Sequence, residues 1–355
     1  MTYKSPMEQM SKTTPTQFWN DNCSLADLAF AIEHGAVGAT TNPVIVGQVL
    51  EAELPKYKPV IKQLVEENPL ATEDDIAWLL NEKMACDGAE LLYPAYKQTQ
   101  KKAGYISIQT NSKYFRDTEK MVRQAVHFSK LAENMMVKMP MNAQGVAAVE
   151  ECIYRGVNIN ATVSFTVPQA IAVAEAVKRG MDRRAAEGLD NSFLHPVCTI
   201  MVGRVEDWLR EVGEAKNIVV DPQALIMSGV AVFKNAYRIY KERGYHTRLL
   251  AAAFRHHHHW SELIGGEVSM TIPPVWIRRF VGSDITVENR INTPVDPKLI
   301  AQLKKHFPDF NRAYEPDGMK PEEFEGYGAS NRTLMQFLSG YDKMLSIVRG
   351  VMVNG

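Results

Sequence analysis

The sequence predicts an α/β fold of the (β/α)8 or TIM-barrel class, with extra helices and a C-terminal helical tail. Short β-rich stretches alternate eight times with longer segments of helical periodicity. This alternation favours a parallel sheet with right-handed crossovers, which eight strands close most simply into a barrel. An open doubly wound sheet is the alternative, but no GxGxxG fingerprint follows a strand to support it.

Eight short stretches rich in β-branched, aromatic and other apolar residues are the expected strands. They cover residues 16–21, 38–42, 105–110, 135–140, 157–163, 197–202, 248–254 and 268–273.

The expected helices between the strands carry recognisable end signals. One opens with Ser24 as N-cap and closes on Gly35, a second opens on Asp117, and a third covers 167–180 and closes on Gly180. The long connection 43–103 has room for two or more helices that decorate the barrel.

The whole chain, residues 1–355, is interpreted as a single domain. The barrel core is expected at about 16–290 and a C-terminal helical extension at about 297–355. The final amphipathic segment, 332–350, must bury its apolar face on the barrel rim or against a second subunit, so a homo-oligomer is one expectation.

Composition excludes several classes of partner. A formal net charge of -1 over 355 residues favours neither nucleic acid nor an anionic membrane. The N-terminus lacks a signal-peptide pattern and no run is long enough to span a bilayer, so a cytoplasmic protein is expected. Cys23, Cys86, Cys152 and Cys198 are widely spaced, which is typical of free thiols in a reducing compartment.

Polar residues stand at the end of almost every expected strand, where a barrel gathers its reacting groups. In strand order they are Asp21, Asn42, Gln109, Lys138, Asn160 with Thr162, Thr199 followed by Arg204, and Arg255. Strands commonly end in polar residues, so the combination matters more than the list. It holds one lysine, one carboxylate, amides, hydroxyls and two arginines, and no spaced set of metal ligands or cofactor fingerprint.

Lys138 stands within the apolar run MMVKMP, where an ammonium group loses hydration. Desolvation lowers the pKa of a lysine, and the free amine can then attack a carbonyl to form a Schiff base. The iminium serves as an electron sink for carbon–carbon cleavage. A snorkelling or ion-paired lysine is the structural alternative at this position.

His256–His259 form an internal run that raises a zinc-dependent class II aldolase as another alternative. Adjacent histidines cannot all point at one ion, and no HxH with a distant carboxylate stands out. We therefore expect a polar loop after strand seven and no metal.

The stretches GATTNP, VKMP....G, GVNINATVSF...QA, MVGRVEDW and AAAFRH occur in the order and at about the spacing of the transaldolase family, which this chain resembles from about Asp21 to Pro273. The resemblance implies a class I Schiff-base enzyme on a (β/α)8 barrel that acts on small sugar phosphates without a cofactor. It implies that Lys138 forms the Schiff base and Asp21 shuttles protons. It also implies substrate contacts from Asn42, Asn160 and Thr199, water positioning by Thr162, and a phosphate grip by Arg204 and Arg255.

Three positions depart from the family pattern. Gln109 replaces the usual glutamate of strand three, as in the fructose 6-phosphate aldolase branch, and an amide can orient a water but cannot take its proton. Met201 stands where that branch has a tyrosine, and Ala253 where a serine is common.

The expected activity is transfer of a dihydroxyacetone unit from a ketose phosphate to an aldehyde phosphate, a step of the pentose phosphate type. A fructose 6-phosphate aldolase-like lyase, a transaldolase for a sulfonated sugar, and a non-catalytic sugar-phosphate binder are the alternatives. Simple binding needs neither Lys138 nor Asp21, so the last of these is disfavoured.

Overall fold

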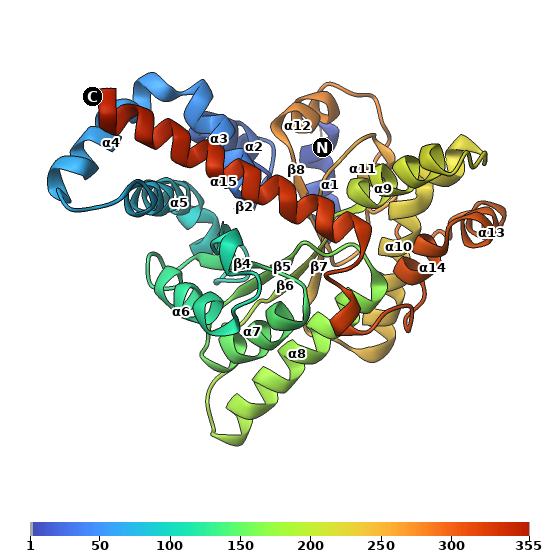
Figure 1. Ribbon diagram of the computed structural model, residues 1–355. Helices are drawn as coiled ribbons and strands as arrows, with labels where there is room; N and C mark the ends of the chain where they lie inside the picture. Colours follow the sequence, from blue (N-terminus) through green and yellow to red (C-terminus); the bar gives the residue numbers. More distant parts are fainter. Residues whose placement is uncertain (1–2, 355) are drawn as a thin grey trace.

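Eight parallel strands close into a barrel at the centre of the molecule, in the order β1 to β8 (Figure 1). The computed structural model describes residues 3–354. The strands are β1 Gln17–Asn20, β2 Gly38–Thr40, β3 Tyr105–Gln109, β4 Met135–Pro140, β5 Ile159–Thr162, β6 Val197–Ile200, β7 Arg248–Ala251 and β8 Ser269–Ile272. All eight predicted strands are confirmed, and β1 pairs with β8 to complete the closure.

Helices follow the strands and form the outer layer. After each strand in turn come α2 Leu25–Glu33, then α3 Pro43–Ala52 with α4 Leu54–Glu67 and α5 Glu73–Gln98, then α6 Thr118–Phe128, α7 Ala143–Tyr154, α8 Val167–Ala186, α9 Val202–Ala215 with α10 Pro222–Arg243, α11 His258–Ser261 and α12 Pro274–Val281. A short helix α1, Pro6–Thr13, precedes the barrel, and α13 Pro297–His306, α14 Pro308–Tyr314 and α15 Gly328–Asn354 end the chain. Two 3-10 turns, Ser112–Tyr114 and Pro321–Glu323, complete the described part. The long second connection thus holds three helices, in line with the prediction.

Side-chain caps explain where several helices begin. Asp117 accepts a hydrogen bond from the backbone N–H of Lys120 at 2.9 Å and so opens α6, as predicted. Ser24 is the N-cap residue of α2, although its side chain makes no capping hydrogen bond. Gly35 follows that helix with φ +101°, a left-handed conformation that glycine adopts without strain.

The predicted end of the helix at Gly180 is wrong, because α8 continues to Ala186. Gly180 lies inside the helix where α8 packs on α7. A Cβ at this position would lie 2.7 Å from the carbonyl oxygen of Glu150. The glycine therefore permits close helix packing and does not terminate the helix.

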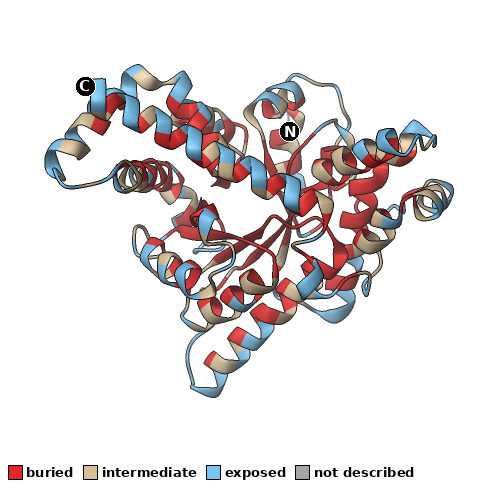
Figure 2. Cartoon of the chain, viewed as in Figure 1, coloured by how far each residue is buried: buried red, intermediate tan, exposed pale blue. Residues whose placement is uncertain are grey.

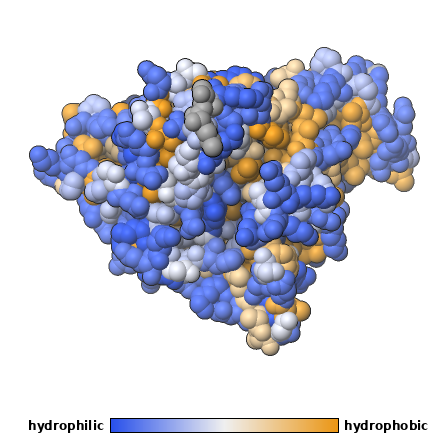
Figure 3. Space-filling model, turned by 180° about the vertical axis from the view of Figure 1, so that it is seen from behind, coloured by the Kyte–Doolittle hydropathy of each residue, from blue (hydrophilic) through white to orange (hydrophobic). Residues whose placement is uncertain are grey.

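The barrel is closely packed beside Gly38, the first residue of β2. The Trp19 indole fills the space beside Gly38, where a Cβ would lie 2.6 Å from the ring. Figure 2 shows the strands and the inner faces of the surrounding helices as buried, and the outer faces of the helices as exposed. Figure 3 shows that the back of the molecule is largely hydrophilic, with scattered hydrophobic areas.

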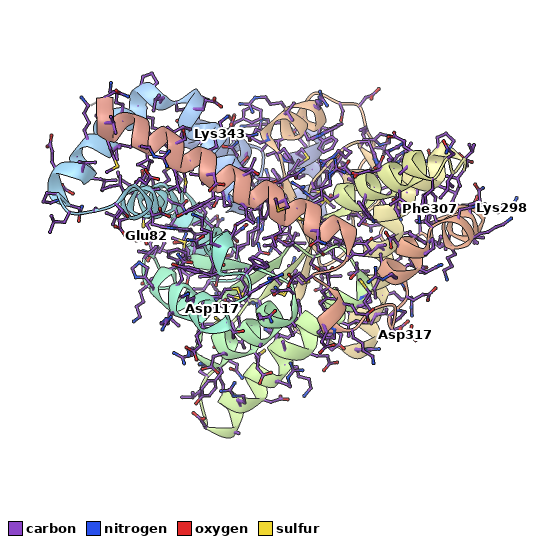
Figure 4. The ribbon with its side chains drawn as sticks, in the orientation of Figure 1. Glu82, Asp117, Lys298, Phe307, Asp317 and Lys343 are labelled. Atoms are coloured by element: carbon purple, nitrogen blue, oxygen red, sulfur yellow. The ribbon has the colours of Figure 1, made fainter. Side chains whose placement is uncertain are left out.

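The C-terminal helix α15 crosses the molecule from α9 to α4 (Figure 1). Its apolar side chains, including Met344, Leu345 and Val348, join α3, α4 and α5 in a second hydrophobic cluster. Lys343, labelled in Figure 4, pairs with Glu51 of α3 at 2.5 Å. The amphipathic tail therefore buries its apolar face within its own chain, on the rim of the barrel. None of the helices in residues 3–354 has both the length and the apolar character needed to cross a bilayer.

Candidate active site

Lys138 projects from β4 into the barrel, where it is 3% exposed. Its Nζ donates a hydrogen bond to the carbonyl oxygen of Thr41 at 3.2 Å. Burial lowers the pKa of Lys138, the charge of Arg204 lowers it further, and the carboxylate of Asp21 offsets part of this. The Lys138 amine is therefore neutral more often in this site than a lysine side chain is in water.

Asp21 comes directly after β1 and lies near enough to Lys138 for their charges to interact. Its carboxylate accepts a hydrogen bond from the Thr40 hydroxyl at 2.7 Å, and Thr40 is in turn paired with the Thr271 hydroxyl. Burial raises the pKa of Asp21, while Lys138, Thr40 and Arg204 each hold it down in part. Such a group can exchange a proton closer to neutral pH than an exposed aspartate.

Asn160 and Thr199 form a buried network with a third side chain, Ser107 of β3. The Asn160 amide donates to the Ser107 hydroxyl at 3.1 Å and its oxygen accepts from the Thr199 hydroxyl at 2.8 Å. Because Lys138 and Asn160 are paired in register, the amide lies on the strand next to the lysine. The network fixes the amide orientation across three strands.

Gln109 and Thr162 each present a buried oxygen that has no hydrogen-bond partner within residues 3–354. Gln109 pairs in register with Lys138, and its Nε2 donates to the Ser112 hydroxyl at 3.3 Å, which leaves Oε1 unpartnered. A buried unpaired acceptor is costly, by about 1–3 kcal/mol. These two atoms therefore mark where a polar ligand group or a water would be stabilised.

Asn42 has a structural task in addition to any contact with a ligand. It is the N-cap of α3, and its Oδ1 accepts from the backbone N–H of Ile45 at 3.0 Å. This capping bond holds the side chain at the C-terminal end of β2.

Arg204 and Arg255 lie near one another at the mouth of the barrel but differ in their partners. Arg255 forms two hydrogen bonds to the Asp207 carboxylate, at 3.0 and 2.6 Å. Arg204, at the start of α9, makes no ion pair in the described chain, and its Nε has no partner there. Burial, and then the charge of Arg255, lowers the pKa of Arg204 to about 10. The two guanidinium groups together form a positively charged site that could bind an anion.

A family model described as transaldolase/fructose-6-phosphate aldolase matches residues 18–316. The chain belongs to this family. The family resemblance predicted from the motifs is thereby confirmed.

Relatives named transaldolase align with much of the chain. One from Thermobifida fusca is 29% identical over 67% of this chain and 66% of its own length. One from Thiobacillus denitrificans is 32% identical over 63% of this chain and 64% of its own length. A relative named transaldolase 2, from Nostoc sp., is 27% identical over 93% of this chain and 96% of its own length. The matched part of this chain therefore covers slightly less than two thirds of the length of the first two relatives and nearly all of the third.

The histidine run of this transaldolase-family chain was predicted to form a polar loop, but His259 is fully buried and contributes to a cluster with Glu206 and His256. Glu206, His256 and His259 bring their potential ligand atoms within 4.8 Å of one another. However, Nδ1 of His259 accepts the backbone N–H of Arg255 at 3.1 Å, so the neutral ring carries its proton on Nε2 and offers no lone pair there. Arg210 occupies the other carboxylate oxygen of Glu206 at 2.6 Å. The cluster is thus a hydrogen-bonded network behind Arg255.

Four further residues lie at or close to the candidate site and were not singled out from the sequence. Asp207 pairs with Arg255, and two residues of α15, Thr333 and Gln336, accept hydrogen bonds from Arg204. Gln169 is fully buried and donates to the carbonyl oxygens of Met141 and Val163, at 3.0 and 3.2 Å. Gln169 was visible within the quoted family motif, whereas the contacts of α15 depend on tertiary packing that no local pattern encodes.

Proposed function

We propose that this chain is a transaldolase that moves a dihydroxyacetone unit from a ketose phosphate to an aldehyde phosphate through a Schiff base on Lys138. The observation that carries the proposal is a buried lysine with a lowered pKa beside a carboxylate with a raised one, inside a barrel of this family. Membership in the family and relatives named transaldolase support the same activity.

In the proposed mechanism the neutral amine of Lys138 attacks the ketose carbonyl and water leaves, forming an iminium. Asp21 takes the proton of the C4 hydroxyl as the C3–C4 bond breaks, and the bonding electrons pass into the iminium to give an enamine. The aldehyde product departs, and the enamine attacks the acceptor aldehyde while Asp21 returns the proton. Hydrolysis of the new iminium then releases the ketose.

The remaining roles follow from the chemistry of each side chain. Asn42, Asn160 and Thr199 are proposed to bind sugar hydroxyls, and Thr162 with Gln109 to orient water near the iminium. Arg204 and Arg255 are proposed to bind the phosphate, because guanidinium donors match phosphate oxygens. Because sugar phosphates are soluble metabolites, we also propose that the enzyme is cytoplasmic and has no nucleic-acid or membrane partner.

A fructose 6-phosphate aldolase-like lyase is the second candidate, since it shares the steps up to cleavage. It would protonate the enamine and release dihydroxyacetone. The aldolase branch has a tyrosine where this chain has Met201, directly after β6, and a methionine side chain cannot donate a proton to the enamine. We therefore propose transfer as the main reaction.

Incubation with a ketose phosphate, with and without an aldehyde phosphate acceptor, tests this choice. Transfer should yield the new ketose, with dihydroxyacetone as a minor product. Release of dihydroxyacetone without acceptor, at a rate equal to transfer, would assign the chain to the aldolase reaction instead.

A further inference from the structure

Helix α15 lies outside the part of the chain that matches the family, which ends at residue 316, whereas α15 begins at Gly328. Its neighbours are segments that follow the C-terminal ends of strands: α3 after β2, the turn Ser112–Tyr114 after β3, and α9 after β6. Pro140 and Val163, at the ends of β4 and β5, share a pocket with Ser330 and Leu334 of α15. The helix is therefore positioned over the mouth of the barrel, as Figure 1 also shows.

Three residues on one face of α15 surround the guanidinium of Arg204. The hydroxyl oxygen of Thr333 accepts from Nη1 of Arg204 at 3.3 Å, and Oε1 of Gln336 accepts from the same nitrogen. Phe337, which is buried, places its ring centroid 6.0 Å from the guanidinium carbon. Spacings of three and four residues put these side chains on one side of the helix.

These partners are neutral, and this distinguishes Arg204 from Arg255. The Asp207 carboxylate forms a bidentate pair with Arg255 and offsets its charge. Asp207 and Asp21 lie within range of the charge of Arg204, but neither accepts a hydrogen bond from it in residues 3–354. An amide oxygen and a hydroxyl orient the guanidinium without neutralising it, which leaves its positive charge available to a ligand.

We propose that Gln336, with Thr333, is a specificity-determining part of the anion site, added to the barrel by α15. Gln336 holds Arg204 through Oε1, and its NH₂ group can donate to an oxygen of a bound anion. The ligand class is a sugar carrying a terminal phosphate. The inference rests on the proposed function, because it assumes that a phosphorylated sugar enters the mouth occupied by Arg204.

Substitution of Gln336 by glutamate provides the sharpest test, because the two side chains have nearly the same shape. The carboxylate of Gln336→Glu would pair with Arg204 and repel the phosphate. KM for a ketose phosphate should rise about 10- to 100-fold with kcat much less affected. Gln336→Ala should raise KM by a smaller factor, and Thr333→Val by about two- to fivefold, since each removes one hydrogen bond. Met335→Ala is the matched control, since Met335 neighbours Gln336 on α15, is 62% exposed, and is not among the α15 residues that contact Arg204 in residues 3–354.

Unphosphorylated dihydroxyacetone with borohydride gives the second readout. All of these variants should still form the reduced Lys138 adduct, because this ligand has no anion. Equal KM values for wild type and Gln336→Glu, with the adduct intact, would overturn the role of Gln336 alone. Failure of wild type to form the adduct would overturn the proposed function instead. Equal losses with both ligands would indicate that α15 is structural.

Discussion

At the residue scale, the chemistry depends on placing Lys138 among groups that shift its pKa in opposite directions. Burial and the charge of Arg204 favour the amine, while Asp21 favours the ammonium form. The same burial raises the pKa of Asp21. A lysine and an aspartate that approach each other in pKa can exchange protons with a substrate at neutral pH.

Substitution of Asp21 by asparagine should lower the pKa of Lys138 further, because it removes the carboxylate whose negative charge raises that pKa. The pH at which reductive alkylation of Lys138 is half-maximal should fall, although turnover is lost. Arg204→Met should move the same midpoint upward, since it removes a positive charge. A mass-spectrometric titration of the Lys138 adduct measures both shifts. If the midpoint stays unchanged in both variants, or moves in the direction opposite to the one predicted, these two charges do not control the pKa of Lys138.

Replacing Lys138 by methionine should stabilise the fold while abolishing activity. The pKa of Lys138 is lower in the folded state than in the unfolded chain, so between these two pKa values the unfolded state binds more protons and stability rises with pH. At pH values below both pKa values, the buried ammonium group of Lys138 stays charged in the folded protein and its full desolvation cost is present. We expect Lys138→Met to raise the free energy of unfolding by about 1–3 kcal/mol at pH 7, with a smaller gain near pH 10. Urea denaturation at the two pH values measures this, and a less stable methionine variant at pH 7 would contradict it.

The candidate site could largely be predicted from the sequence because its groups stand at the C-terminal ends of parallel strands. Lys138, Gln109, Asn160 and Thr199 lie inside the barrel as the strand order requires. The partners of the arginines could not be predicted in this way. Gln336 reaches Arg204 across 132 residues of sequence, and only the packing of α15 decides that contact.

At the element scale, the alternation of strands and helices was enough to predict the barrel, whereas helix ends were harder to predict. A glycine after a periodic segment usually signals a helix end, but Gly180 lies inside α8. The same residue type serves close packing there, and sequence alone does not separate the two uses. Two or more helices were predicted for the long second connection, which holds three, whereas α1 was not predicted.

Gly180→Ala should destabilise the protein by about 1–3 kcal/mol, because the added methyl group would press on the backbone of α7. Gly350→Ala is the matched control, since no atom lies within 4 Å of a Cβ at that helical position. The control should be neutral or stabilising by up to about 1 kcal/mol, through helix propensity. Denaturant unfolding of both variants compares them. Equal free energies of unfolding would mean that α7 and α8 do not pack as described.

At the scale of the whole molecule, α15 joins the decorating helices to the mouth of the barrel. Tyr341 links it to α5, donating to Asp74 at 2.6 Å and accepting from the Trp78 indole at 3.0 Å. Met344 and Val348 are buried in the same cluster. Helix α15 thus packs against α3, α4 and α5 at one end and positions the Arg204 side chain at the other.

Val348→Ala should weaken this coupling locally, at a cost of about 1–3 kcal/mol from lost burial and the cavity left behind. Amide hydrogen exchange should accelerate in α3, α4 and α15, and the strands β4 to β7 should keep their protection. Val353→Ala, at a position 76% exposed on the same helix, should change neither. Uniform loss of protection across the strands would contradict the separation of the two hydrophobic clusters.

The central claim is that Lys138 forms a Schiff base with a ketose, and reductive trapping tests it most directly. Wild-type protein is incubated with fructose 6-phosphate and borohydride, digested, and analysed by mass spectrometry, with Lys138→Ala treated in parallel. A single stable adduct on Lys138, absent from the variant together with turnover, is the predicted result. An adduct on another lysine, or turnover that persists in Lys138→Ala, would contradict the proposed mechanism.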